Sequence, residues 1–223
     1  MILPKVVIFD LGKVLVDFDY AIAVRRIAAR GRITAEEFGR FIATAPLLFH
    51  YELGQLTSEE FYKEVRDLTG FSGNFDEFSL AFGDIFVPIE PMVRLHAALR
   101  KRGMPTFILS NTNALAVRHI RRSYPFFSDF QGYILSYEHG VMKPEPKIYE
   151  IAERVTGQQG PDILYLDDRP ENITAAAERG WQVILQETPQ KTLQAMGSWM
   201  EAAPPGKRPG SAAGETPAAT GLG

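Results

Sequence analysis

The sequence predicts an α/β protein with a doubly wound parallel (Rossmann-like) sheet core and an inserted all-helical cap. Two observations predict this fold class. Short apolar runs without polar alternation recur along the chain, as expected for strands that are covered on both faces. Helical segments separate most of these runs, which is the order of elements in a parallel sheet. One long interval, 17–87, shows only helical patterns and is therefore expected to be the insert.

The core elements follow from these runs and from the residues between them. Five strands are expected, at 6–9, 106–109, 132–135, 163–166 and 182–185. Helices are expected at 92–102, 114–123, 147–156 and 171–179. Prolines stand at the start of three of these helices and glycines at the end of three, which is the usual punctuation of helices.

The expected cap begins after the first strand. Thr34 to Glu37 and Thr57 to Glu60 each have the pattern of a capping box that opens a helix, and further helical patterns cover 19–29 and 75–86. Eight phenylalanines in this interval are expected to form its small core. The predicted domains are therefore 1–16 plus 88–201 for the core and 17–87 for the cap. Residues 202–223 are rich in proline and glycine and are expected to be a disordered tail.

Composition excludes several classes of function. The 223 residues are 45% hydrophobic and 23% charged, with a formal net charge of −3, so no basic field indicates a nucleic-acid partner. There is no cysteine, which excludes disulfides, thiolate catalysis, zinc fingers and iron–sulfur clusters. The sequence shows no signal-peptide pattern and no apolar run long enough to span a membrane, so a cytoplasmic protein is expected.

Acidic residues follow two of the expected strands. Asp10 ends the first strand, and Asp167 and Asp168 end the strand at 163–166. Parallel strands bring their carboxyl ends to one edge of the sheet, so these carboxylates are expected to converge. They would repel one another unless a cation lay among them, and oxygen ligands suit Mg²⁺. Mg²⁺ is therefore the expected cofactor.

A phosphate cradle is expected at the same edge. Ser110 and Asn111 follow the strand at 106–109, and Lys143 lies in a proline-stiffened loop that leads into a helix. A serine hydroxyl, a backbone amide and a lysine could together hold the oxygens of a phosphate. Because a carboxylate such as Asp10 can attack phosphorus, the parts predict metal-assisted phosphoryl transfer through an aspartyl-phosphate.

The order of these motifs resembles that of the haloacid dehalogenase superfamily, over roughly residues 5–187. The four segments that carry the resemblance are Phe9 to Leu15, Leu109 to Thr112, Lys143-Pro144 and Leu166 to Asn172. The helical insert is similar to that family's first-position cap. Asp-Leu-Gly-x-Val and the stretch 49–57 most resemble the α-D-glucose-1-phosphate phosphatase group.

The resemblance implies a role for each matching residue. It implies Asp10 as nucleophile and metal ligand, Ser110 and Lys143 as catalytic residues, and Asp168 as the acidic metal ligand, with Asp167 and Asn172 next to the metal or reaching it through water. Leu11, Gly12, Ser110, Asn111 and Lys143 are expected to bind the substrate phosphate, and the Gly12 carbonyl to ligate the metal. His50 and Glu52, on an expected cap loop, are candidates for substrate contact.

One position departs from the family pattern. The common motif is Asp-x-Asp, whose second carboxylate moves a proton to the leaving group and then from water, and Gly12 occupies that place. A substrate whose leaving group departs easily, such as a sugar 1-phosphate, suits this departure. We therefore expect a Mg²⁺-dependent phosphatase for a small phosphorylated metabolite. The alternatives are a metal-independent 2-haloacid dehalogenase and a module that binds phosphate without catalysis.

Overall fold

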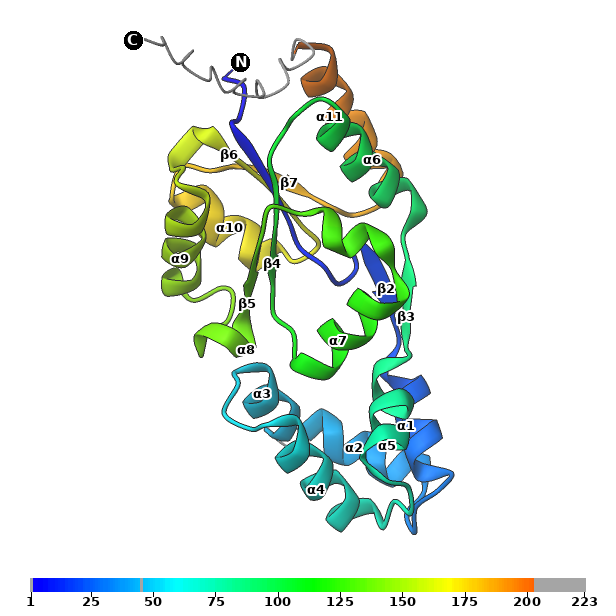
Figure 1. Ribbon diagram of the computed structural model, residues 1–223. Helices are drawn as coiled ribbons and strands as arrows, with labels where there is room; N and C mark the ends of the chain where they lie inside the picture. The colour runs from blue at the N-terminus through cyan, green and yellow to red at the C-terminus, as the bar shows by residue number, and fades with distance from the viewer. Residues whose placement is uncertain (1, 45, 203–223) are drawn as a thin grey trace, which may run out of the picture.

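A computed structural model describes residues 2–44 and 46–202, and its core is a five-stranded parallel sheet in the order β5-β4-β1-β6-β7 (Figure 1). The strands are β1 (Val6–Phe9), β4 (Thr106–Ser110), β5 (Gly132–Leu135), β6 (Ile163–Asp167) and β7 (Gln182–Leu185). All five predicted core strands are confirmed, two of them one residue longer than predicted. β1 is central and pairs with β4 on one side and with β6 on the other, so its carboxyl end lies in the middle of the sheet edge.

Helices cover both faces of this sheet. The helices of the core are α6 (Glu90–Lys101), α7 (Ala114–Ser123), α8 (Ser136–His139), α9 (Pro146–Thr156), α10 (Pro170–Glu178) and α11 (Pro189–Ala202), with 3₁₀ turns at Pro125–Asp129 and Gly160–Asp162. Successive side chains of a strand point to opposite faces. Val7 and Phe9 of β1 accordingly pack in the cluster that contains α6, α7 and α11, whereas Val6 and Ile8 pack in the one that contains α9 and α10. The predicted doubly wound fold is therefore confirmed.

The cap is a group of five helices at the end of the core (Figure 1). They are α1 (Tyr20–Ala28), α2 (Ala35–Thr44), α3 (Leu47–Glu52), α4 (Ser58–Thr69) and α5 (Phe75–Gly83). Both predicted capping boxes form: the Glu37 and Thr34 pair opens α2, and the Glu60 and Thr57 pair opens α4. The expected aromatic core is present as well, with Phe61 packed against the rings of Phe78 and Phe82.

Two expectations about the cap are wrong. The interval 17–87 was expected to contain no strand, yet β2 (Val16–Phe18) and β3 (Phe86–Pro88) form a two-stranded antiparallel ribbon where the chain crosses between core and cap. Strands of three residues are too short to show a period of two in the sequence. His50 and Glu52, expected on a loop, belong instead to the short helix α3 (Leu47–Glu52).

The carboxyl-terminal part of the described chain is α11, which packs against α6. The predicted disorder concerns a tail that, apart from Ala202, lies outside the described residues. Within 2–44 and 46–202, no helix has both the length and the apolar character needed to cross a membrane.

Candidate active site

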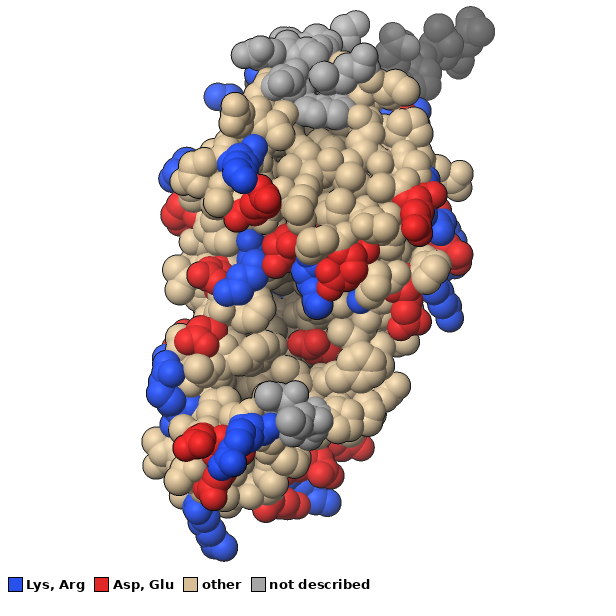
Figure 2. Space-filling model, turned by 180° about the vertical axis from the view of Figure 1, so that it is seen from behind, with Lys and Arg blue, Asp and Glu red and all other residues tan. Residues whose placement is uncertain are grey.

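The carboxyl edge of the sheet faces a cleft of about 300 Å³ that lies between the core and the cap. Its lining combines residues of the core loops with residues of the cap and the ribbon, among them Asp10, Ser110, Lys143, Phe18, Tyr20 and Glu52. The space-filling view shows the molecule hollowed between core and cap, with charged side chains of both signs around the hollow (Figure 2). The residues that the sequence placed after β1, β4 and β6 therefore do meet at one site.

Asp10 follows β1 directly and is buried at the floor of this cleft. Its Oδ1 accepts a hydrogen bond from the Leu11 N–H at 2.7 Å and lies 2.9 Å from Lys143 Nζ. Burial raises the pKa of Asp10 to about 7; the charge of Lys143 opposes this rise and that of Asp167 adds to it. Neither close contact uses Oδ2, which leaves that oxygen for other chemistry.

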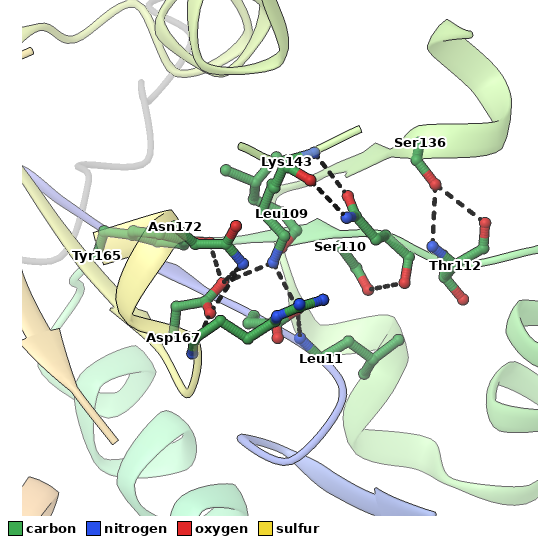
Figure 3. Close-up of polar contacts among 12 residues, drawn as sticks. Leu11, Leu109, Ser110, Thr112, Ser136, Lys143, Tyr165, Asp167 and Asn172 are labelled. Atoms are coloured by element: carbon green, nitrogen blue, oxygen red, sulfur yellow. Dashed lines mark hydrogen bonds and ion pairs between the residues drawn. The ribbon is translucent and has the colours of Figure 1, made fainter. Parts of the chain in front are cut away.

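Lys143 is the buried cation of the site. Its Nζ lies 2.7 Å from Asp167 Oδ2 and donates to the Leu109 carbonyl at 3.0 Å (Figure 3). The same Nζ lies 2.9 Å from Asp10 Oδ1. Burial alone would lower the pKa of this amine, but the charges of Asp10 and Asp167 outweigh burial, so the pKa is raised. Lys143 is therefore a permanent positive charge between two carboxylates.

Asn111 holds the loop that carries Lys143. Its Oδ1 accepts the Lys143 N–H at 2.8 Å, and its Nδ2 donates to the Lys143 carbonyl at 2.9 Å. Both ends of the Asn111 side chain are thus used on protein backbone. The Asn111 side chain positions Lys143 and is not available to a phosphate. The expected phosphate contact of Asn111 would therefore use its backbone N–H.

Asp167 is fully buried and accepts hydrogen bonds on both oxygens. Its donors are Lys143 Nζ, the Tyr165 hydroxyl, the Arg169 N–H at 2.8 Å, and Asn172 Nδ2, which lies 3.0 Å from one oxygen and 3.1 Å from the other. Burial by itself would raise the pKa of Asp167, but Lys143 and these donors lower it. This carboxylate is therefore occupied as an anchor for Lys143 and the loop after β6, and the expected role as a metal ligand does not fit its contacts.

The carboxylate cluster fits a divalent cation. Asp10, Asp167 and Asp168 each offer an oxygen within 4.8 Å of the others, although Asp167 is already saturated. Burial raises the pKa of Asp168, and the negative charge of Asp167 adds to this rise. Three carboxylates face one lysine, and all the ligand atoms are oxygen, which suits Mg²⁺. Asp10 and Asp168 are the residues that would hold it, with the Gly12 carbonyl at the same edge of the cleft.

The ring of Phe18 packs against Gly12 in the loop that follows β1. A Cβ built on Gly12 would stand 2.8 Å from Cε1 of the Phe18 ring, closer than carbon atoms normally approach. The ring therefore occupies the space into which a side chain at position 12 would extend. Sequence reasoning missed Phe18, because nothing in the sequence shows that β2 folds back over Gly12.

The structure separates the two cap residues that the sequence paired. Glu52 lines the cleft, where Tyr20 donates a hydrogen bond to its Oε1 at 3.3 Å. His50 instead lines a second hollow, formed by α2, α3 and α4, so the cleft geometry does not support the expected substrate contact of His50, which stays a prediction. Residues two apart on a helix point in directions about 160° apart. Tyr20 was missed as a cleft residue, since its position depends on the packing of α1 against the cap.

Comparison with known proteins places this geometry in a family. The haloacid dehalogenase-like hydrolases match residues 4–180, which include the β1, β4 and β6 loops and the whole cap. The chain belongs to this hydrolase family. Its enzyme class is consistent with a phosphoric monoester hydrolase, because two curated relatives are phosphatases.

Two phosphatases are distant relatives of this haloacid dehalogenase-like hydrolase, and each match spans most of both chains. D-ribitol-5-phosphate phosphatase of Bacteroides thetaiotaomicron is 25% identical over 190 residues, which are 82% of this chain and 92% of that one. The sesquiterpene phosphatase astK of Aspergillus oryzae is 22% identical over 179 residues, which are 79% of this chain and 86% of that one. A crystal structure of a family enzyme of B. thetaiotaomicron, in complex with magnesium and inorganic phosphate, has a TM-score of 0.74 at 23% identity, with coverage of 82% and 93%.

Proposed function

We propose that this hydrolase is a Mg²⁺-dependent phosphatase that hydrolyses a small phosphorylated metabolite, such as a sugar phosphate, through an aspartyl-phosphate on Asp10. The contacts of Asp10 carry the proposal. Lys143 Nζ and the Leu11 N–H both lie on Oδ1, and together they orient the carboxylate in the cleft. Oδ2 then attacks phosphorus, and the bond between phosphorus and the leaving oxygen breaks.

The other residues of the cleft bind and orient the phosphate in this proposal. Ser110, which lines the cleft, donates its hydroxyl to a phosphate oxygen, and the Asn111 N–H donates to another. Lys143 balances the charge that gathers on phosphate and carboxylate, held in place by Asp167. Mg²⁺ held by Asp10 and Asp168, with the Gly12 carbonyl, would supply further positive charge beside the phosphate oxygens.

The size and lining of the cleft support a small substrate. A volume of about 300 Å³ is at the lower end of the range for ligand pockets, which favours a metabolite of few carbons over a long isoprenoid. The relative that acts on D-ribitol 5-phosphate, and the resemblance of residues 49–57 to the α-D-glucose-1-phosphate phosphatase group, favour a sugar or sugar-alcohol phosphate.

Phosphate release from a panel of sugar phosphates tests the proposal, with and without Mg²⁺. We expect EDTA to stop release and Mg²⁺ to restore it, and Asp10→Asn to abolish it while the circular dichroism spectrum stays unchanged, because an amide cannot attack phosphorus. Asp168→Ala should require far more Mg²⁺ or fail entirely. Halide release from 2-chloropropionate in EDTA would instead indicate the dehalogenase, and phosphate binding without turnover of any substrate would indicate the binding module.

A further inference from the structure

The proposed reaction includes two proton transfers, and the side chain that the family pattern provides for them is missing at Gly12. The leaving oxygen must gain a proton, and the water that hydrolyses the aspartyl-phosphate must lose one. Gly12 has no side chain, and the Phe18 ring fills the space where one would stand. The proton must therefore move through another group in the cleft.

The remaining ionisable residues of the cleft can be sorted by their contacts. Asp10, Lys143 and Asp168 already serve the phosphate and the cation in the proposed reaction. Lys13 pairs with Asp17 and donates to the Phe18 carbonyl at 2.9 Å, and Arg169 lies 2.6 Å from Glu171. Both of those cations are also exposed, and each already has a carboxylate partner. This leaves Glu52 with its partner Tyr20, on the cap side of the cleft.

Glu52 lies in surroundings that suit a proton carrier. In the part of the chain that the structure describes, no ion pair involves its carboxylate, and its hydrogen-bond partner is the Tyr20 hydroxyl at 3.3 Å. Burial raises the pKa of Glu52 to about 7, with the hydrogen bond from Tyr20 as the opposing effect. A carboxyl group that is half-protonated near neutrality can both give and take a proton.

The fold fixes Glu52 relative to the phosphate loop. The Ser136 hydroxyl donates to the Glu52 carbonyl at 2.6 Å and accepts the Thr112 N–H at 2.9 Å, so one core side chain joins the end of α3 to the loop after β4. The chain then passes very close to the core, because a Cβ at Gly54 would lie 2.1 Å from the Tyr137 carbonyl oxygen. Glu52 is thus held at a set position over the cleft although it belongs to the cap.

We propose that Glu52 is the general acid and base of this enzyme and replaces the carboxylate that the family pattern places at Gly12. This inference rests on the proposed phosphatase function. As Asp10 bonds to phosphorus, the leaving oxygen takes the proton of Glu52 and departs as an alcohol. A water then loses a proton to the Glu52 carboxylate and attacks phosphorus, which breaks the bond to Asp10, releases inorganic phosphate and restores protonated Glu52.

Rapid-mixing kinetics of Glu52→Gln on two substrates test this role. With a sugar phosphate that the wild type hydrolyses, kcat should fall about 10²–10⁴-fold, since the leaving alkoxide needs a proton. With p-nitrophenyl phosphate, whose leaving group departs as an anion, one nitrophenolate per enzyme should appear at nearly the wild-type rate, followed by slow turnover. Glu64→Gln, an exposed glutamate of the cap outside the cleft, should leave both substrates unchanged.

Two other results would overturn the role. If Glu52→Gln raised KM with kcat unchanged, Glu52 would be a binding residue. If the variant slowed nitrophenolate formation as much as sugar phosphate hydrolysis, Glu52 would maintain the structure of the cleft and would not protonate the leaving group. Glu52→Asp, which keeps a carboxyl group, should recover part of kcat. Failure of the wild type itself to release phosphate from any substrate would refute the phosphatase proposal instead, so the two failures are distinguishable.

Discussion

Replacement of Lys143 by methionine should cost the apo protein about 3–5 kcal/mol of unfolding free energy, the usual loss when one partner of a buried ion pair is removed. Lys143 Nζ is within 3.0 Å of three oxygens, two of them on carboxylates, and the side chain is almost fully buried. Methionine fills a similar volume, so the loss comes from two uncompensated carboxylates and not from a cavity. A loss of this size is a large share of the stability of a typical domain.

Urea denaturation at neutral pH in EDTA measures this loss, because the chelator removes stabilisation by a bound cation. Lys147→Met is the matched control, since Lys147 is exposed on α9 and should change stability by less than about 0.5 kcal/mol. Adding Asp167→Asn to Lys143→Met should recover part of the loss, because one of the stranded charges is then gone. A loss below about 1 kcal/mol for Lys143→Met would refute the argument that this cation holds the carboxylates together.

Three smaller predictions follow from other contacts. Gly12→Ala should lower stability by about 1–3 kcal/mol in thermal unfolding, and Phe18→Leu should relieve that loss; equal effects in both backgrounds would contradict the contact. Thr57→Ala removes the N-cap hydrogen bond of α4 and should lower the free energy of unfolding in urea by about 1 kcal/mol; an unchanged urea midpoint would count against this prediction. Glu153 has a lowered pKa because, although burial opposes it, Arg179 and Trp181 donate to it, so its contribution is complete above its ordinary pKa of 4.5 and is lost as the pH falls further. Glu153→Gln should therefore cost about 1–2 kcal/mol at pH ~7 and much less at pH ~3, and a constant difference would refute this assignment.

The convergence of the site could be predicted because it depends on local rules. Apolar runs that stop at Asp10, Ser110 and Asp167 mark strand ends, and a parallel sheet brings strand ends together. The capping boxes of the cap were equally visible, since each consists of residues three apart. These features need no knowledge of which surfaces meet.

What could not be predicted depends on contacts between distant segments. Nothing near Asn111 in the sequence shows that its amide is used on the backbone of Lys143, 32 residues away. The same is true of the Phe18 ring over Gly12, and of Glu52, which lies at the cleft only because α3 ends against Ser136. The residue types were informative, but their partners were set by tertiary packing.

The β2–β3 ribbon has a consequence for how this enzyme can vary. The chain leaves the core and returns to it through adjacent paired strands, so the two ends of the insert are held one strand spacing apart by the pairing of β2 with β3. The entropy needed to close that loop depends only weakly on the length of the insert. Insertions and deletions in the cap can therefore reshape the roof of the cleft while the register of β1 against β4 and β6, and with it the spacing of Asp10 and Lys143, stays the same.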